Sequence, residues 1–192
     1  RGLVPLQMDM LDTLRAGLDD DAIVISGVTN VGYWGNICFP VKQPRTYITS
    51  SYFGTLGYAF PTALGAKIGN PDKQVVALSG DGGFMYCATE LSTAVKFGIN
   101  VVTVVFNNNA FGASRWDQTH RFGERFIATD LHNPDFVAYA ESFGAQGLRA
   151  ETPSELSAAL RRGFDHDGPT LIEVPLGELP SPWHLMHLPR VR

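Results

Sequence analysis

Two runs of consecutive apolar residues constrain the fold of this chain more than any other feature. Residues 74–79 read QVVALS and residues 100–106 read NVVTVVF, and both runs are rich in β-branched side chains. Neither run alternates between apolar and polar positions, so a strand in either place must be covered on both faces. Four further candidate strands lie at residues 22–26, 46–49, 146–149 and 170–174.

Stretches that favour helices separate these strands. They lie at residues 6–17, 61–68, 87–97, 135–143 and 153–165. The sequence Thr152-Pro153-Ser154-Glu155 is typical of a helix start. The alternation predicts a three-layer α/β/α open sheet, mostly parallel, with about six strands and helices on both faces. Residues 112–131 and the Pro-rich tail 177–192 lack clear periodicity, and we expect irregular functional loops or covers there.

Composition limits the class of protein. A chain of 192 residues that is 44% hydrophobic can bury one substantial core, so residues 1–192 are expected to form a single domain. The net charge of −4 comes without a basic stripe, which argues against nucleic acid, and no apolar run approaches the ~20 residues of a membrane span. Cys38 and Cys87 lie in apolar surroundings, and we expect buried thiols and a cytoplasmic protein.

Residues 80–83, GDGG, place one acid in a permissive turn directly after an expected central strand. Ligands bind at the carboxyl ends of such strands, and glycines with helix-start amides favour a phosphate. Asp81 would repel a phosphate unless a cation lies between them. Residues 107–110, NNNA, follow the next strand and must reach the same edge. One Asp, one Asn amide and one backbone carbonyl are a plausible protein share of a magnesium site.

Gly80-Asp81-Gly82, a spacer of twenty-four residues and Asn107-Asn108 together resemble the cofactor-binding motif of thiamine diphosphate-dependent enzymes. The branch that the sequence is most similar to holds acetolactate synthase, benzoylformate decarboxylase and benzaldehyde lyase. The resemblance covers about residues 24–174 and matches the C-terminal, diphosphate-binding domain of that family. Since the chain opens with Arg1 rather than Met, we expect a C-terminal fragment of a longer chain, with a natural split subunit as the alternative.

The resemblance implies roles for individual residues. It assigns Mg²⁺ to Asp81, the Asn108 side chain and the carbonyl of Ala110. Thiamine diphosphate would contact a wider set of residues, namely Thr29, Asn30, Gly54, Leu56, Gly80, Gly82 and Gly83 together with those metal ligands. In this set Leu56 would force the cofactor into its bent shape, and the backbone carbonyl of Gly54 would accept a hydrogen bond from the exocyclic amine of the aminopyrimidine. Thr29 and Asn30 are equally consistent with plain turn residues.

The catalytic Glu of the family belongs to a separate pyrimidine-binding domain, so no catalytic residue is expected in this chain. The implied partners are that domain, from the same or another chain, within a homodimer or tetramer, and a small 2-oxo acid or aldehyde substrate. Carboligation of the acetolactate synthase type is the first expectation, and decarboxylation or aldehyde lysis is the alternative. Pyruvate decarboxylases of this family carry a further catalytic Glu six positions beyond the metal-binding Asn, and Ser114 occupies that position here. This difference argues against that decarboxylase subtype. A plain nucleotide-binding module is the competing interpretation, but it gives no reason for the paired Asn at residues 107 and 108.

Overall fold

The structure is a computed structural model that describes residue 2 and residues 4–185. Its sheet has six strands in the order β2-β1-β3-β4-β6-β5, and every neighbouring pair is parallel. The strands are β1 (Ile23–Ser26), β2 (Tyr47–Thr49), β3 (Val75–Gly80), β4 (Val102–Asn107), β5 (Gln146–Arg149) and β6 (Thr170–Pro175). The predicted six-stranded α/β sheet is therefore confirmed, and it is parallel throughout the described residues.

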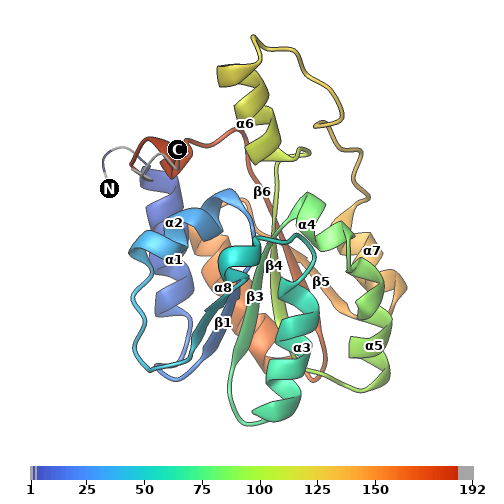
Figure 1. Ribbon diagram of the computed structural model, residues 1–192. Coiled ribbons are helices and arrows are strands. Elements are labelled where there is room, and N and C mark those ends of the chain that lie inside the picture. Colours follow the sequence, from blue (N-terminus) through green and yellow to red (C-terminus); the bar gives the residue numbers. More distant parts are fainter. Residues whose placement is uncertain (1, 3, 186–192) are drawn as a thin grey trace.

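Helices cover both faces of the sheet and complete three layers (Figure 1). One face carries α1 (Pro5–Ala16), α2 (Asn30–Cys38) and α8 (Pro153–Asp165). The other carries α3 (Ala59–Gly69), α4 (Asp81–Met85), α5 (Leu91–Lys96) and α7 (Phe136–Ser142). Short 3₁₀ turns lie at η1 (Ser51–Phe53), η2 (Ala88–Glu90) and η3 (Pro182–Leu185). Residues 186–192 of the expected tail lie outside the described residues.

Burial explains why β3 and β4 lack polar alternation. All six residues of β4 are buried, as are the first five of β3. Their side chains divide between two apolar clusters, one on each face of the sheet. The two central strands therefore hold the carboxyl edge of the sheet in a fixed position.

Three expectations need correction. Residues 112–131 are not wholly irregular, because they include α6 (Gly112–Arg121), which rises above the edge of the sheet (Figure 1). The single helix expected at 87–97 is instead η2 followed by α5, and a separate short helix, α4, already starts at Asp81 within the expected turn. Cys38 is exposed and Cys87 only partly buried, and both are free thiols. Cys38 ends α2, where the chain turns toward solvent.

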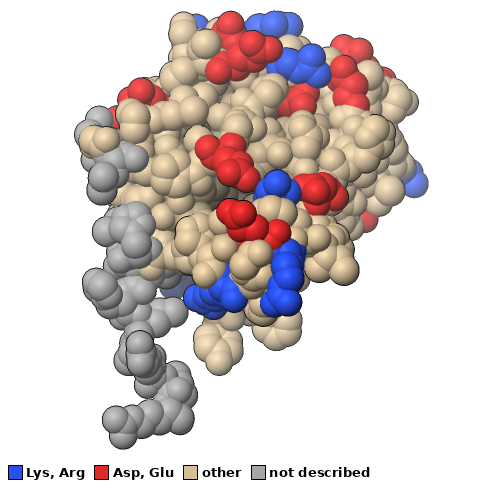
Figure 2. Space-filling view, turned by 90° about the horizontal axis from the view of Figure 1, so that it is seen from above, with Lys and Arg blue, Asp and Glu red and all other residues tan. Residues whose placement is uncertain are grey.

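The face above the carboxyl edge of the sheet agrees with the charge pattern of the sequence. Seen from above the carboxyl edge, acidic and basic side chains are interspersed, with no continuous basic stripe (Figure 2). In the described part of the chain, none of the helices has the length and apolar character that crossing a bilayer requires.

The expected start of α8 is a complete capping box. Thr152 Oγ1 accepts from the Glu155 amide at 3.2 Å, and Glu155 Oε2 accepts from the Thr152 amide at 3.3 Å. Replacing Thr152 by Ala removes one of these bonds and should lower the free energy of unfolding by about 1 kcal/mol, whereas Thr152→Ser should keep most of it. Urea titration measures both variants, and equal loss in the Ser variant would contradict the capping role.

Candidate functional site

Loops from the carboxyl ends of five strands meet above the sheet. The chain leaves β1 toward β2 on one side and leaves β3 toward β4 on the other, so the crevice between β1 and β3 is a topological switch point. A Cβ built on Gly80 would lie 3.4 Å from Thr29 Oγ1, so the two loop starts are adjacent there. Open parallel sheets bind ligands at such crevices.

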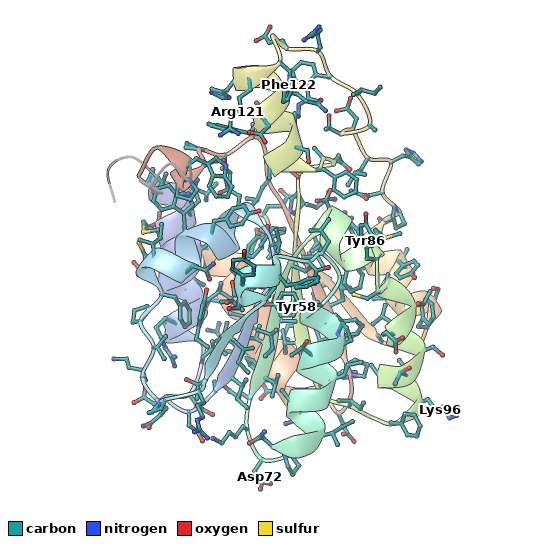
Figure 3. The ribbon with its side chains drawn as sticks, in the orientation of Figure 1. Tyr58, Asp72, Tyr86, Lys96, Arg121 and Phe122 are labelled. Atoms are coloured by element: carbon teal, nitrogen blue, oxygen red, sulfur yellow. The ribbon has the colours of Figure 1, made fainter. Side chains whose placement is uncertain are left out.

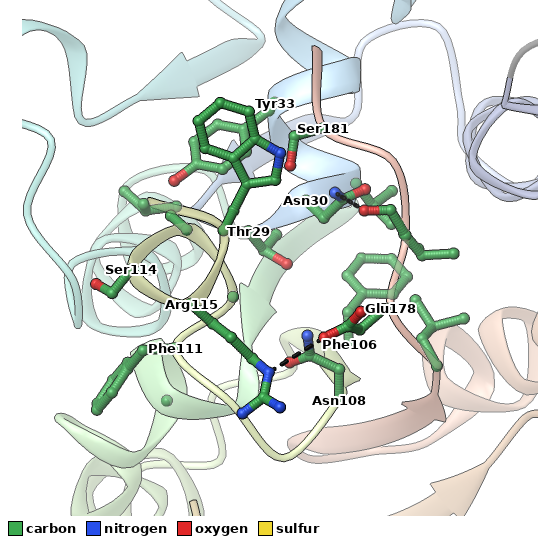
Figure 4. A pocket seen from close by; sticks show the side chains of 18 of the residues that line it. Thr29, Asn30, Tyr33, Phe106, Asn108, Phe111, Ser114, Arg115, Glu178 and Ser181 are labelled. Carbon is green, nitrogen blue, oxygen red and sulfur yellow. Dashed lines mark hydrogen bonds and ion pairs between the residues drawn. The ribbon is translucent and has the colours of Figure 1, made fainter. Parts of the chain in front are cut away.

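A cavity of about 340 Å³ opens at this crevice (Figure 4). It is lined by residues 28–31 after β1, Leu56 after β2, Gly82 and Gly83 after β3, residues from Asn108 onward after β4, and residues from Leu176 onward after β6. Six of the residues predicted from the sequence line it, namely Thr29, Asn30, Leu56, Gly82, Gly83 and Asn108. The cavity therefore joins segments that are far apart in the chain.

Helix starts surround this cavity. The first residues of α2, α4 and α6 lie in or directly beside its wall. The first amides of a helix lack intrahelical partners and carry the positive end of the helix dipole. Three such starts around one cavity make an environment that favours an anion, with a phosphate as the usual occupant.

Asp81 lies beneath the cavity wall rather than in it. Its exposed fraction is 2%, and no Lys or Arg of the described residues lies within ion-pair distance. Burial raises the pKa of this carboxyl, although hydrogen bonds from Asn133 and from the backbone of Gly82 and Ala110 oppose that shift. A buried carboxylate without a cationic partner is costly, and a divalent ion would offset this cost. The donor set thus fits a cation.

The loops after β3 and β4 start side by side. The register pairs Gly80 with Phe106, so Asp81 and Asn107 leave the sheet as neighbours. Asn133 Nδ2 lies 2.7 Å from Asp81 Oδ2 and 3.0 Å from Asn107 Oδ1, which joins the two loops. Ala110 is 9% exposed, and its backbone forms an isolated antiparallel β-bridge with that of Asp130. Within the described residues, no cluster of three or more His, Cys, Asp or Glu side chains suits a metal. Amide and carbonyl oxygens would have to supplement the single carboxylate.

Gly82 stands where no side chain fits. A Cβ there would come within 2.5 Å of the Phe111 ring and 3.1 Å of Leu131 Cδ1. Gly83 lies next to Leu56, since its own Cβ would be 3.6 Å from Leu56 Cδ2. Leu56 and the glycine turn therefore bound the same part of the cavity. Gly54, by contrast, lies away from the cavity wall, exposed and in the left-handed region with φ of 56°.

Asn30 has a second engagement. Its Nδ2 donates to the carbonyls of Leu179 and Pro180 at 3.2 and 3.1 Å, and Trp34 Nε1 donates to the latter at 2.9 Å. These bonds hold the segment after β6 against α2, where it forms one wall of the cavity. Asn30 is therefore not the plain turn residue of the alternative interpretation, because it begins α2 and has structural contacts of its own.

Several residues at this site were not predicted. Arg115 on α6 pairs with Glu178 at 3.1 Å (Figure 4), which ties α6 to the tail wall. Arg115 also pairs with Asp130, which ties α6 to the returning loop. Trp116 and Thr119 line the same wall from α6. Asn133 joins the two loop tips. Of these residues only Trp116 has a signal in the sequence, because it resembles a tryptophan near the substrate channel of acetolactate synthases, with plain packing as an equal alternative.

The family assignment agrees with this geometry. Residues 27–174 match the family model of the thiamine pyrophosphate enzyme, C-terminal TPP binding domain. The chain belongs to that family, and the predicted resemblance is confirmed.

Individual relatives agree with this family assignment. The chain is 38% identical over 169 residues to an acetolactate synthase from Bacillus subtilis, covering 88% of this chain and 30% of that protein. A probable 2-ketoarginine decarboxylase from Pseudomonas aeruginosa is 36% identical, with 90% and 31% covered. A solved structure, the thiamine diphosphate-dependent 4-hydroxybenzoylformate decarboxylase from Rhodococcus jostii, superposes with a TM-score of 0.81 at 32% identity, with 91% and 32% covered. The chain thus spans about a third of the length of these proteins.

Proposed function

We propose that this chain binds the diphosphate of thiamine diphosphate through Mg²⁺ at the carboxyl edge of its sheet. The observation that carries the proposal is Asp81, which is 2% exposed beside a cavity that three helix starts surround. An anion in the cavity and a cation at Asp81 satisfy each other, and Mg²⁺ prefers carboxylate, amide and phosphate oxygens. Asp81, Asn108 and the Ala110 carbonyl would hold the ion, and the amides of Gly82 and Gly83 would meet the diphosphate.

The remaining cofactor contacts follow from the same arrangement. Leu56 packs beside Gly83 and would support the bent cofactor, while Thr29 and Gly80 face each other across the switch point. Asn30 and Gly54 complete the proposed set. Bound thiamine diphosphate supplies a nucleophilic carbon and an electron sink for cleavage next to a carbonyl group. The residues of this chain would bind and orient it and exclude water.

The whole protein is proposed to act on small 2-oxo acids by carboligation of the acetolactate synthase type. The similarity to acetolactate synthases supports this choice. Decarboxylation is the second candidate, and similarity to a 4-hydroxybenzoylformate decarboxylase and a probable 2-ketoarginine decarboxylase favours it. Incubation with pyruvate and, separately, with benzoylformate separates them, since carboligation yields acetolactate from pyruvate and decarboxylation of benzoylformate yields an aldehyde.

A pyrimidine-binding domain is the proposed partner, and it would supply the catalytic Glu. Tyr52 and Phe53 are almost fully exposed just before the Leu56 segment, and Tyr86 is 68% exposed beside α4 (Figure 3). Exposed aromatic side chains at one edge favour a protein interface. We place this single domain within a longer polypeptide or a split enzyme, in a homodimer or tetramer. The two free thiols support a reducing cytoplasm.

Calorimetry on the native protein that carries this chain tests the cofactor assignment. Thiamine diphosphate should bind in the presence of Mg²⁺ and lose most of its affinity when EDTA removes the ion, because the ion bridges two anions. NAD and ATP serve as comparison ligands and should not bind. Binding of either nucleotide without thiamine diphosphate binding would instead favour the plain nucleotide-binding module.

A further inference from the structure

The side-chain amide of Asn133 lies where three loop segments converge. Its Nδ2 is 2.7 Å from Asp81 Oδ2, 3.0 Å from Asn107 Oδ1 and 3.2 Å from Asn109 Oδ1. A carboxamide nitrogen carries only two hydrogens, so the shortest contact, to the charged oxygen, takes one of them. Asn133 therefore gives Asp81 its one side-chain donor among the described hydrogen bonds.

The start of α7 does not need this side chain. Asp135 caps that helix by accepting from the amides of Val137 and Ala138 at 2.9 and 3.1 Å. The backbone of the returning loop is held separately, because the Leu131 amide donates to the Asn109 carbonyl at 2.8 Å. A purely local structural role thus leaves the position of the Asn133 amide unexplained.

A buried pair fixes which way the amides point. Asn107 Nδ2 donates to Glu173 Oε1 at 2.7 Å, and Glu173 Oε2 accepts from Arg149 Nε at 2.9 Å. Asn107 and Glu173 are 8% and 4% exposed. A carboxylate only accepts, so Asn107 must turn its NH₂ group toward Glu173 and its oxygen toward the loop.

The orientation of Asn107 determines that of Asn133. Asn107 Oδ1 accepts from the Asn109 amide at 3.0 Å and from Asn133 Nδ2. Asn133 must therefore present its NH₂ group, and not its oxygen, to this junction and to Asp81. The Arg149–Glu173 pair thus fixes the donor and acceptor sides of Asn107. Asn107 in turn fixes those of Asn133, which donates to the buried Asp81 carboxylate.

We propose that Asn133 is a positioning residue for the Mg²⁺ site, with Asn107 and Glu173 setting its orientation. The inference rests on the proposed function. Asn133 holds Asp81 by Oδ2, and a carboxylate held through one oxygen presents the other in a fixed direction to a metal ion. It also keeps the loop after β4, which carries Asn108 and Ala110, close to Asp81. Both effects act on the arrangement of ligands before the ion binds.

The test is the affinity of the native protein for Mg²⁺, titrated calorimetrically in the presence of saturating thiamine diphosphate. Asn133→Ala should weaken Mg²⁺ binding roughly 10–100-fold, the range typical when groups that orient metal ligands are removed. The midpoint of thermal unfolding in EDTA should stay close to that of the wild type, because the loop keeps its backbone bonds. If the Ala variant does not fold, Asn133→Ser provides the same measurement.

Two control variants test whether the effect comes from the hydrogen bond between Asn133 and Asp81 or from the loss of any Asn contact. Asn109→Gly removes the third acceptor while the glycine keeps the left-handed backbone, φ 55°, and it should change the affinity less than twofold. Asn70→Ala removes one Asn hydrogen bond, 3.0 Å to the Ala66 carbonyl, at the opposite end of the sheet, and it should leave the affinity unchanged.

The outcomes distinguish this inference from the function on which it rests. A wild-type protein that binds no Mg²⁺ with thiamine diphosphate would overturn both. A wild type that binds, with an Asn133→Ala or Asn133→Ser variant that is folded and has unchanged affinity, would overturn the positioning role alone. A lower unfolding midpoint without a change in affinity would show that Asn133 is merely structural.

Discussion

Replacing Asp81 by Asn is expected to weaken Mg²⁺-dependent binding of thiamine diphosphate about 30-fold or more. Loss of one partner in a buried charge pair costs roughly 2–5 kcal/mol, and each 1.4 kcal/mol is a factor of ten. Asn keeps the shape of the side chain but removes the charge that would hold the ion. Calorimetric titration of both proteins with Mg²⁺ and the cofactor measures the ratio.

The same substitution should not destabilise the metal-free protein. Burial raises the pKa of the Asp81 carboxyl in the folded state. The folded protein then binds more protons than the unfolded chain between the ordinary and the raised pKa, so stability falls as pH rises through that interval and stays lower above it. An uncharged Asn avoids this loss, and the unfolding midpoint in EDTA at neutral pH should be equal or higher.

Asp72→Asn is the matched control. Asp72 is exposed at the end of the molecule opposite the cavity (Figure 3), so its replacement should change neither cofactor binding nor the unfolding midpoint. If Asp81→Asn binds the cofactor as the wild type does, Asp81 is not a ligand of the ion.

Replacing Gly27 by Ala should lower the free energy of unfolding by about 1–3 kcal/mol. A Cβ there would lie 2.5 Å from the Leu78 carbonyl oxygen, which belongs to the backbone of β3 and cannot rotate away. The Gly27 amide donates to that same oxygen at 2.8 Å, so the clash and the hydrogen bond compete. Urea unfolding of the metal-free protein measures the loss.

The Gly27→Ala variant should also weaken cofactor binding. The end of β1 must move away from β3, and this displaces Thr29 from Gly80 at the crevice where the cofactor is proposed to bind. Gly65→Ala is its control. Gly65 is an exposed position inside α3 with no atom near its would-be Cβ, and Ala there should stabilise the protein by about 0.4–1 kcal/mol. Equal stability of the Gly27 and Gly65 variants would contradict the close approach of the strands.

The central strands β3 and β4 were predictable because burial on both faces leaves a continuous apolar run. Each expected strand overlaps an observed one, with boundaries that differ by up to two residues. The edge of the sheet where the site lies followed from the same pattern, since parallel strands end together. Asp81, Asn108 and the glycine turn could thus be brought to one place without knowing any contact.

The missed helices lack the signal that helix prediction uses. No residue of α6 is buried, so its sequence GASRWDQTHR has no apolar stripe. Within α2, Gly32 and Gly35 lower the helix propensity. Both glycines are required by packing, because a Cβ would come within 2.5 Å of the Gly27 carbonyl oxygen and 2.6 Å of the Tyr47 hydroxyl, respectively.

Asn133 could not be found from the sequence for a different reason. It lies 52 residues beyond Asp81, between the stretch 112–131 and the helix expected at 135–143, and its position depends on the loop that returns from α6. Tertiary hydrogen bonds of this kind leave no local pattern. The wall formed by the segment after β6 escaped prediction similarly, since backbone carbonyls make its contacts with Asn30 and Trp34.

A crystal structure of the native protein with thiamine diphosphate and Mn²⁺, located by its anomalous scattering, is the decisive test of the proposed metal site. One ion should lie within bonding distance of Asp81, the Asn108 side-chain oxygen and the Ala110 carbonyl, with diphosphate oxygens completing its coordination. An ion bound elsewhere, or a cofactor whose diphosphate avoids the helix starts at Asn30 and Asp81, would contradict it.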